Sequence, residues 1–207
     1  MPNVSIIGAG KMGTAIARIA IKSGASVQIL APSLEHATAT AADVGATASA
    51  VGDVLTGDIV ILAVPYSAVS ELVATYAEQM DGKIVVDITN PIDQSTYDSL
   101  VVPADSSAAE QIAKAVPGAR VLKAFNTTFA STLASGLVGG RPTTVLVAGD
   151  DQSAKDELIG MVTGGGVRAL DVGSLKRARE VEAIGFLMVK LASAGAISWG
   201  GGFAVVE

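Results

Sequence analysis

Glycines near the N-terminus are the residues of this chain whose spacing points most directly to a chemical role. The segment Gly8-Ala9-Gly10-Lys11-Met12-Gly13 fits the pattern G-x-G-x-x-G. It follows an apolar run, Val4 to Ile7, and precedes apolar residues at helical spacing, Ala15, Ile16, Ile19 and Ala20. In a strand–turn–helix unit such glycines let the backbone approach a pyrophosphate, and the helix amides and dipole hold its charge. The sequence therefore predicts a dinucleotide-binding turn, and the alternative is a turn that only connects a strand and a helix.

Each glycine of this turn has its own expected task. Gly8 makes the tight turn, Gly10 admits the pyrophosphate, and Gly13 lets the helix pack on the strand. A larger residue in place of Gly10 is therefore expected to abolish cofactor binding and to spare the fold. The other residues of the turn that we expect to bind the cofactor are Ala9, Lys11 and Met12.

The residues after the second apolar run bear on which dinucleotide is bound. NAD-specific sites usually have an Asp or Glu about 20 residues past the glycines, which binds the ribose 2′-hydroxyl. This chain has Leu30-Ala31-Pro32-Ser33-Leu34-Glu35-His36 there, with no carboxylate at the end of the run. Ser33 can donate a hydrogen bond to a 2′-phosphate, and His36 can add a second donor or can be a solvated helix residue. The pattern favours NADP, and NAD stays open because neither donor is an arginine. The candidate residues here are Ala31, Pro32, Ser33 and His36.

Three more loops follow apolar runs and are expected to face the same crevice, because ligands of open parallel sheets bind outside the carboxyl ends of the strands. Pro65 fixes the backbone where a helix begins, so its loop can lie along the ribose and pyrophosphate. Asn90 and Asn126 can hold a carboxamide or can satisfy turn amides. Asp87 is expected to cap a helix or loop rather than to do chemistry. The candidate cofactor-binding residues of these loops are Ala63, Val64, Pro65, Tyr66, Asn90, Pro91, Ala124, Phe125 and Asn126.

No side chain stands out as an acid–base catalyst. The chain has no cysteine and one histidine, so a thiolate nucleophile, a cysteine-ligated metal and a typical zinc site are not expected. Hydride transfer between two cofactors needs no such group, because it needs the two carbons held about 3 to 3.5 Å apart. The same absence fits a protein that binds a nucleotide without turnover.

Two later features leave alternatives open. The run Lys176-Arg177-Ala178-Arg179, followed by Glu180 and Glu182, opens the last helical pattern. Positive charge there is opposed by the helix dipole, which suggests a buried partner or ligand, but a solvated face with local ion pairs is favoured. Trp199 and Phe203, in a glycine-rich segment, suggest either a wall of an acceptor pocket or a plain core or dimer contact, and the latter is favoured.

The elements that position these residues follow from periodicity. Apolar runs alternate with helical patterns, as in repeated βαβ units, and 50% of the 207 residues are hydrophobic while 4% are aromatic. The class is therefore α/β, a Rossmann-type doubly wound parallel sheet with a small C-terminal α/β extension. We expect a nucleotide-binding domain over residues 1–140 and a small C-terminal portion over 141–207, with a soft boundary between Gly136 and Pro142. The expected strands are 4–7, 26–30, 59–64, 83–88, 120–124, 144–148 and 168–172, and the expected helices 12–22, 34–44, 66–79, 107–115, 152–161 and 176–192.

Charge and hydropathy limit the partners. The net charge is −6 and no run of basic residues offers a stripe that could track phosphates, which argues against a nucleic-acid partner. No segment approaches the roughly 20 apolar residues needed to span a bilayer, and the N-terminus, Met1-Pro2-Asn3-Val4, lacks a basic region followed by an apolar stretch. We therefore expect a cytoplasmic protein without a membrane partner. Small residues in the last helix permit close packing in a homodimer or within one chain.

Taken together, several motifs resemble a known family. They are Gly8 to Gly13, Ala63-Val64-Pro65-Tyr66, Asp87-Ile88-Thr89-Asn90-Pro91, Lys123-Ala124-Phe125-Asn126, and Leu170-Asp171-Val172-Gly173-Ser174-Leu175 followed by Ala178-Arg179-Glu180. The chain resembles the NADP oxidoreductases that depend on the deazaflavin coenzyme F420, and the related cytosolic reductase domain of six-transmembrane metalloreductases. The late motif from Asp171 to Leu175 is more specific than the glycine turn.

This resemblance implies a Rossmann domain, often in a homodimer, that passes hydride between NADP(H) and a flavin-like partner, a flavin or a deazaflavin, bound against the nicotinamide. By position it implies that residues of the glycine turn line the pyrophosphate, that Ala31, Pro32 and Ser33 surround the 2′-phosphate, and that Val64, Pro65, Asn90 and residues 124–126 line the ribose and nicotinamide. The chain departs from the family at Ala31-Pro32, where the deazaflavin enzymes commonly have a Ser-Arg pair. Two other functions stay open: reduction of a small imine or carbonyl, and a redox-sensing module that binds NADPH without turnover.

Overall fold

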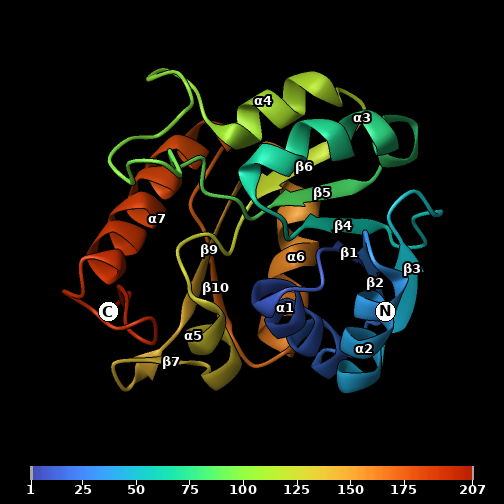
Figure 1. Ribbon diagram of the computed structural model, residues 1–207, viewed down its shortest axis with the longest axis horizontal. Helices are drawn as coiled ribbons and strands as arrows, with labels where there is room; N and C mark the ends of the chain where they lie inside the picture. The colour runs from blue at the N-terminus through green and yellow to red at the C-terminus, as the bar shows by residue number, and fades with distance from the viewer. Residues whose placement is uncertain (1, 207) are drawn as a thin grey trace.

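Strands from both halves of the chain pair into one sheet in the computed structural model, which describes residues 2–206. The strands of this sheet are β1 (Asn3–Ile7), β2 (Ser26–Ala31), β3 (Thr47–Ala50), β4 (Ile59–Leu62), β5 (Ile84–Asp87), β6 (Arg120–Lys123), β9 (Thr144–Gly149) and β10 (Arg168–Asp171). Their order across the sheet is β10-β9-β6-β5-β4-β1-β2-β3 (Figure 1). The predicted α/β class is confirmed, with a sheet that is mostly parallel.

The last two strands run against the others. The pairs from β3 to β6 are parallel, β9 is antiparallel to β6, and β10 is parallel to β9. Only the last two residues of each strand pair in the antiparallel step, Leu122 with Gly149 and Lys123 with Ala148. Most of β9 therefore lies beyond the carboxyl end of β6. The expectation of a parallel sheet therefore fails at the step from β6 to β9, because an apolar run has the same pattern in either direction.

A small hairpin accounts for this change of direction. Strands β7 (Leu137–Val138) and β8 (Arg141–Pro142) pair antiparallel at the predicted boundary, and Gly139 and Gly140 between them have positive φ angles of 55° and 75°. Positive φ is readily adopted by glycine, so this sequence makes a tight reversal. The hairpin leads directly into β9.

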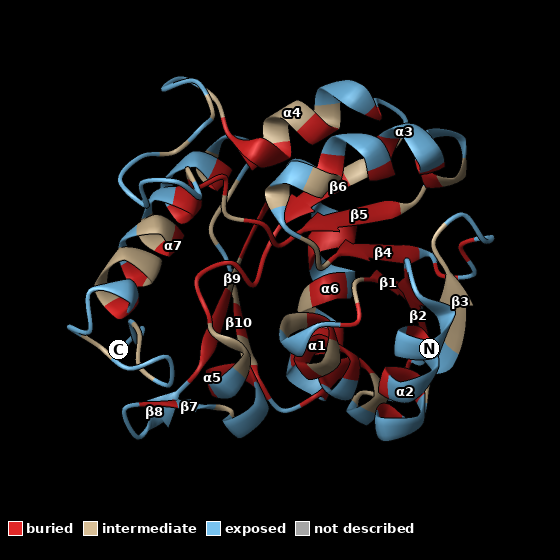
Figure 2. Ribbon diagram, in the orientation of Figure 1, coloured by how far each residue is buried: buried red, intermediate tan, exposed pale blue. Residues whose placement is uncertain are grey.

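Helices cover both faces of the sheet (Figure 1). On one face α1 (Lys11–Lys22), α2 (Leu34–Val44) and α6 (Gln152–Gly164), with the short α5 (Ala130–Ser135), share one apolar core with the strands. On the other face α3 (Val69–Met80) and α4 (Ala108–Ala115) form a second core. The central strands lie buried between these layers, whereas the edge strands β3 and β10 are largely half-buried or exposed (Figure 2).

The last helix lies beside this three-layer body. Helix α7 (Ala178–Ser193) follows the 3-10 turn η2 (Leu175–Arg177) and contacts α4, and the C-terminal segment returns towards α5 (Figure 1). Another 3-10 turn, η1 (Tyr66–Ala68), precedes α3. None of the helices in residues 2–206 is long and apolar enough to cross a membrane.

Most predicted elements are confirmed, and the differences have local causes. The expected strand 59–64 ends at Leu62, and the expected helices from Tyr66 and Lys176 begin with 3-10 turns. The prediction missed β3, α5 and the two-residue strands β7 and β8. Strand β3 consists of small, largely half-buried residues at the sheet edge, and α5 has six residues, too few for a helical period to be recognised.

Candidate functional site

The turn between β1 and α1 presents backbone amides that no side chain caps. Gly10 is the N-cap of α1 and carries no capping group, and the amide of Thr14 is bonded to the Gly10 carbonyl at 2.9 Å. The amides of the first helical turn therefore face outward, where they and the helix dipole favour an anion. This is the local geometry that a pyrophosphate requires.

The three glycines of the turn occupy different surroundings. Gly8 has a φ of +127°, and a Cβ there would collide with the carbonyl oxygen of Ala63. A Cβ on Gly13 would collide with the Gly8 carbonyl, so α1 packs directly on the turn. A Cβ on Gly10 would meet no atom within 4 Å. Gly10 thus borders open space, and the fold itself does not require a glycine there.

Two adjoining clefts begin at this turn. The first, which we name the glycine-turn cleft, has a volume of about 510 Å³ and is lined by Ala9, Gly10, Lys11, Thr14, Ala15, Arg18, His36, Ala130, Ser131 and Ala134. The second, which we name the asparagine cleft, has a volume of about 420 Å³ and is lined by Lys11, Met12, Ile88, Asn90, Asn126, Thr128, Phe129, Ala130, Ser131, Val189 and Trp199. Lys11, Ala130 and Ser131 belong to both clefts, so the two lie side by side. Together they have the extent of a site for an elongated ligand.

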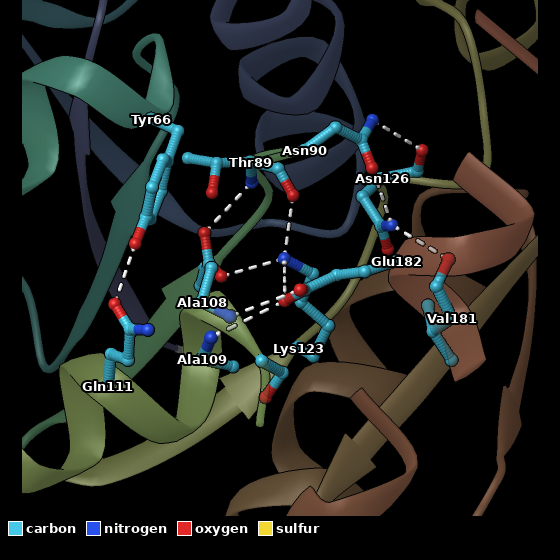
Figure 3. A network of polar contacts seen from close by, with 12 residues as sticks. Tyr66, Thr89, Asn90, Ala108, Ala109, Gln111, Lys123, Asn126, Val181 and Glu182 are labelled. Carbon is cyan, nitrogen blue, oxygen red and sulfur yellow. Dashed lines mark hydrogen bonds and ion pairs between the residues drawn. The ribbon is translucent and has the colours of Figure 1, made fainter. Parts of the chain in front are cut away.

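A pair of asparagines forms one side of the second cleft. The side-chain amide of Asn126 donates to Asn90 Oδ1 at 2.9 Å and to the Val181 carbonyl at 3.0 Å, and Asn90 Nδ2 donates to the Asn126 carbonyl at 3.1 Å (Figure 3). Asn126 Oδ1 is buried and has no hydrogen-bond partner among the described residues. A buried acceptor without a donor is costly, so this atom fits a ligand that donates, such as a carboxamide.

Helix α7 packs directly against Asn90 and Asn126 and leaves no room for a side chain between them. Gly185 of α7 lies against the two asparagines, and a Cβ there would collide with Asn90 Oδ1 and contact Asn126 too closely. Phe125, just before Asn126, is fully buried and has a φ of +63°, a conformation that costs a bulky residue energy. Close packing around the loop that carries Asn126 therefore maintains the unfavourable backbone conformation of Phe125.

A cluster of buried charges lies behind the asparagines. Lys123 Nζ is 2.7 Å from Asp87 Oδ2 and 2.9 Å from Glu182 Oε1, and it donates to the Thr89 carbonyl at 2.6 Å (Figure 3). The three charged side chains are 0% exposed. We name Asp87, Lys123 and Glu182 the buried triad. One ammonium thus joins the ends of β5 and β6 to α7.

Helix α4 supplies further compensation for this charge. Glu182 accepts from the amides of Ala108 at 3.0 Å and Ala109 at 3.4 Å, at the positive end of the α4 dipole. Burial raises the pKa of Glu182 above its ordinary value, and the Lys123 ammonium offsets only part of that effect. Burial also raises the pKa of Tyr66, and the carboxylates of Glu182 and Asp87 add to it. The triad is sealed from solvent, so it supports the site and does not contact a ligand.

The structure brings only part of the predicted site residues into the two clefts. Those in the linings are Ala9, Gly10, Lys11, Met12, His36, Asn90 and Asn126. Ala31, Pro91, Ala124 and Phe125 are buried, and Gly8 and Gly13 shape the turn from within. Pro32 and Ser33 are exposed beside the cleft, where Ser33 caps α2 by accepting from the amide of His36.

The loop after β4 lies outside both linings. Ala63 and Val64 are half-buried and Pro65 is exposed. Tyr66 donates to Gln111 Oε1 at 2.7 Å and borders a separate cavity of about 340 Å³ between α3 and α4. Side chains of this loop therefore do not face the two clefts, and the roles proposed for them depend on backbone contacts.

The sequence did not reveal the buried triad or the cleft-lining residues of α5, which are Ala130, Ser131 and Ala134. The expectation that Asp87 caps a helix or loop is correct in part, because Asp87 accepts a hydrogen bond from the Thr89 amide at 2.8 Å. Asp87 also forms an ion pair with Lys123. The expected solvated face is correct for Arg177 and Glu180, which pair at 3.4 Å, and wrong for Glu182. Opposite charges at the ends of two neighbouring apolar strands were the available signal for the pair between Asp87 and Lys123.

The late motif lies at the other edge of the sheet. Asp171 pairs with Lys155 at 2.8 Å and accepts from the Gly173 amide at 2.8 Å, and Leu175 donates its amide to Asp150 at 2.9 Å. The motif lines neither cleft. It fixes η2, and with it the start of the helix that carries Glu182.

Comparisons with known proteins agree with the resemblance deduced from the sequence. Residues 3–91 match the family model described as NADP oxidoreductase, coenzyme F420-dependent. The F420-dependent NADP reductase of Methanocaldococcus jannaschii is 34% identical over 139 residues, which are 65% of this chain and 62% of that protein. Metalloreductase STEAP3 of Rattus norvegicus is 32% identical over 183 residues, 88% of this chain and 36% of that protein. The chain thus spans less than two thirds of the curated relatives it matches.

Solved structures extend the similarity to the whole fold. A protein of Arthrobacter sp. FB24, named as a candidate F420-dependent NADP reductase, superposes with a TM-score of 0.87 at 25% identity over 100% of both chains. The protein SMa0349 of Sinorhizobium meliloti superposes with a TM-score of 0.74 at 29% identity, over 84% of this chain and 86% of that one. An imine reductase of Bacillus cereus shares the fold at 19% identity, with a TM-score of 0.66 over 94% of this chain and 63% of that one.

Proposed function

We propose that this chain, whose residues 3–91 match the coenzyme F420-dependent NADP oxidoreductases, binds NADP(H) and transfers hydride between its nicotinamide and a flavin or deazaflavin ring. The observation that carries the proposal is the pair of neighbouring clefts, one beside the uncapped amides of α1 and the other beside Asn126 with its unpartnered oxygen. Phosphates fit the first end and a carboxamide fits the second.

The chain's own residues would orient the cofactor in three places. The first-turn amides of α1 and the ammonium of Lys11 would hold the pyrophosphate. Asn126 Oδ1 would accept from the nicotinamide carboxamide, and its hydrogen bonds to Asn90 and Val181 would keep the amide from turning. When bound, NADPH would supply a hydride: a C–H bond of nicotinamide would break, and a C–H bond at C5 of a deazaflavin or an N–H bond at N5 of a flavin would form. Nicotinamide would be oxidised, the ring would be reduced, and solvent would supply the ring's proton.

The lining of the asparagine cleft favours a ring acceptor over a small imine or carbonyl. Among the described residues that line it, Lys11 is the one with an ionisable side chain, and no carboxylate or imidazole is present. Reduction of an imine or carbonyl requires a proton at the reacting group, whereas an extended ring spreads the charge that hydride brings. Positioning is therefore the main task of this cleft.

A preference for NADP follows from the charges of the first cleft. Its lining carries Lys11, Arg18 and His36, and no described carboxylate lies in it. Arg18 is paired with Asp43 at 2.7 Å, but both side chains are more than half exposed, so the pair can open at little cost. Arg18 and His36 would serve a 2′-phosphate in place of the arginine that the family commonly has after the second strand.

Three finer points belong to the same proposal. We propose the division into residues 1–140 and 141–207, a cytoplasmic location, and a homodimer. The candidate loops at Ala31, Pro32 and Ser33, at Ala63 to Tyr66, and at Pro91, Ala124 and Phe125 would contribute to the cofactor site through their backbone.

Calorimetric titration of Gly10→Ala with NADPH and NADH tests the proposal. The wild type is expected to bind NADPH at least about tenfold more tightly than NADH, a difference of about 1.4 kcal/mol. Gly10→Ala should lose most of this binding with an unchanged free energy of unfolding, because its Cβ enters the open space of the cleft. Gly160→Ala is the matched control, since Gly160 is an exposed glycine of α6 whose Cβ also meets nothing within 4 Å.

The outcomes separate the alternatives. Binding of NADPH followed by its oxidation with FMN or coenzyme F420 supports the proposal. Binding without turnover by either acceptor supports a sensing module instead. If the wild type binds neither nucleotide, or if Gly10→Ala binds NADPH as the wild type does, the proposal fails.

A further inference from the structure

We infer that the C-terminal segment, residues 198–203, forms the wall on which a planar aromatic acceptor stacks, with Trp199 as the residue that selects this class of substrate. The inference rests on the proposed function, and it assigns a specific contact to a part of the chain that the family match over residues 3–91 does not reach. It also chooses between the two sequence-based interpretations of Trp199.

The position of Trp199 is the first support. Trp199 lines the asparagine cleft together with Asn90 and Asn126 and with the apolar residues Met12, Ile88 and Val189. Amide groups therefore stand in the same cleft as an aromatic ring. A ligand that fills this volume meets polar groups that orient it and an aromatic surface on which a ring can lie.

A second aromatic ring holds the first in place. The ring centroids of Phe129 and Trp199 are 5.1 Å apart and their planes are inclined by 60°, a tilted arrangement that aromatic pairs favour. Phe129 also lines the cleft and lies three residues after Asn126 in the same loop. The loop that presents the amide therefore carries a support for the indole as well.

The backbone of the segment is anchored on two sides. Ser131 Oγ donates to the Trp199 carbonyl at 2.6 Å, and the Gly201 amide donates to the Ser198 carbonyl at 2.9 Å. Gly202, with a φ of +144°, is packed so that a Cβ would lie 3.2 Å from Met188 and 3.5 Å from Val138. The segment thus joins α5 to α7 and fixes the direction of the indole.

The exposure of the indole is the remaining support. Trp199 is 56% exposed although it is the single tryptophan of the chain and has an aromatic partner at hand. Large aromatic side chains usually bury most of their surface, so the exposed part of this cleft-lining residue is area that a bound ring can cover. Phe203 of the same segment is 51% exposed and does not line the cleft, so the acceptor role falls to Trp199.

A small imine or carbonyl would make little use of this wall. It would occupy the region beside the asparagines and leave the indole in water. A flavin or deazaflavin ring has the planar extent to touch the nicotinamide on one face and the indole on the other. Trp199 exchanges no atom or electron in the reaction, and its role is to position the acceptor.

The single tryptophan makes the contact directly observable. Wild-type protein saturated with NADP⁺ is titrated with FMN and with coenzyme F420 while tryptophan emission is recorded, since a stacked flavin-type ring quenches the indole. Trp199→Ala and Trp199→Phe are then compared through the fluorescence anisotropy of the acceptors, and NADPH affinity is measured by calorimetry in every variant. Phe203→Ala is the matched control, an exposed aromatic residue of the same segment outside the cleft.

We expect saturable quenching in the wild type and acceptor binding at least tenfold weaker in Trp199→Ala. Trp199→Phe should recover most of that loss, and NADPH affinity should stay within about twofold in all variants. Phe203→Ala should bind NADPH and the acceptors as the wild type does.

Two results overturn the inference. If the wild type binds NADPH and an acceptor without quenching, and Trp199→Ala binds the acceptor equally well, the stacking role is wrong and the proposed function stands. If the wild type binds NADPH and neither acceptor, the stacking role fails together with the proposed choice of acceptor.

Discussion

Replacement of Lys123 by methionine tests the most unusual feature of the core, the buried triad. Methionine keeps roughly the length and volume of lysine but removes the ammonium. The change leaves Asp87 and Glu182 without their common cation, and both are 0% exposed. It also removes the donor of the Thr89 carbonyl, which accepts from Lys123 at 2.6 Å.

The magnitude follows from these contacts. Removal of one partner from a buried ion pair typically costs about 3–5 kcal/mol, because the remaining charge stays buried. Here two carboxylates lose the ammonium, while Glu182 keeps its bonds to the amides of Ala108 and Ala109. We therefore expect the free energy of unfolding of Lys123→Met to fall by about 5 kcal/mol at neutral pH, the upper end of that range. This is a large part of the roughly 5–15 kcal/mol that stabilises a typical domain.

Urea denaturation, with the midpoint and slope determined separately, measures this loss. The matched control is the neutral triple variant Asp87→Asn, Lys123→Met and Glu182→Gln, which should recover most of the stability because no uncompensated charge remains. A loss under about 1 kcal/mol for Lys123→Met would refute the reasoning. So would a triple variant as unstable as the single one, since the cost would then come from packing and not from charge.

Two other predictions concern Glu182 and Gly185. Because burial raises the pKa of Glu182 in the folded state, its contribution to stability is complete below the ordinary carboxyl pKa of about 4.3, and it is lost as the pH rises through the raised value. Wild-type stability should therefore fall relative to Glu182→Gln as the pH rises through that window, and urea denaturation across pH 4–8 checks it; parallel pH profiles would contradict the assignment. Gly185→Ala should lower NADPH affinity at least tenfold, because its Cβ displaces Asn90 and Asn126, and the exposed control Gly160→Ala should not. Calorimetry measures both, and wild-type affinity in Gly185→Ala would show that the asparagine pair does not bind the cofactor.

The sequence was most informative where the pattern is local. The glycine turn could be assigned because its three glycines, the preceding apolar run and the following helical period all lie within residues 4–20. Helix α2 was predicted with its observed bounds, because Ser33 caps its start and Gly45 ends it with a φ of 80°. Such signals depend on residues next to one another in the chain, so they survive without knowledge of the fold.

Predictions about the loops were weaker because they depended on strand direction. The carboxyl ends of β5 and β6 do lie side by side, and the loops after them place Asn126 Nδ2 2.9 Å from Asn90 Oδ1. Strand β9 has the same apolar pattern yet runs the other way, so the motif that starts at Asp171 leaves the site. Periodicity identifies a buried strand and contains no information about its direction.

By itself the sequence determined the α/β class, the dinucleotide-binding turn and the order of the main elements, since these depend on spacing along the chain. Tertiary structure alone decided that Lys123 joins Asp87 to Glu182, that Gly185 lies against the asparagines, and that Trp199 faces their cleft. Each of these contacts joins segments far apart in the chain. Their formation depends on how the helices pack on the sheet and on which charges that packing buries, and neither is encoded in the local pattern.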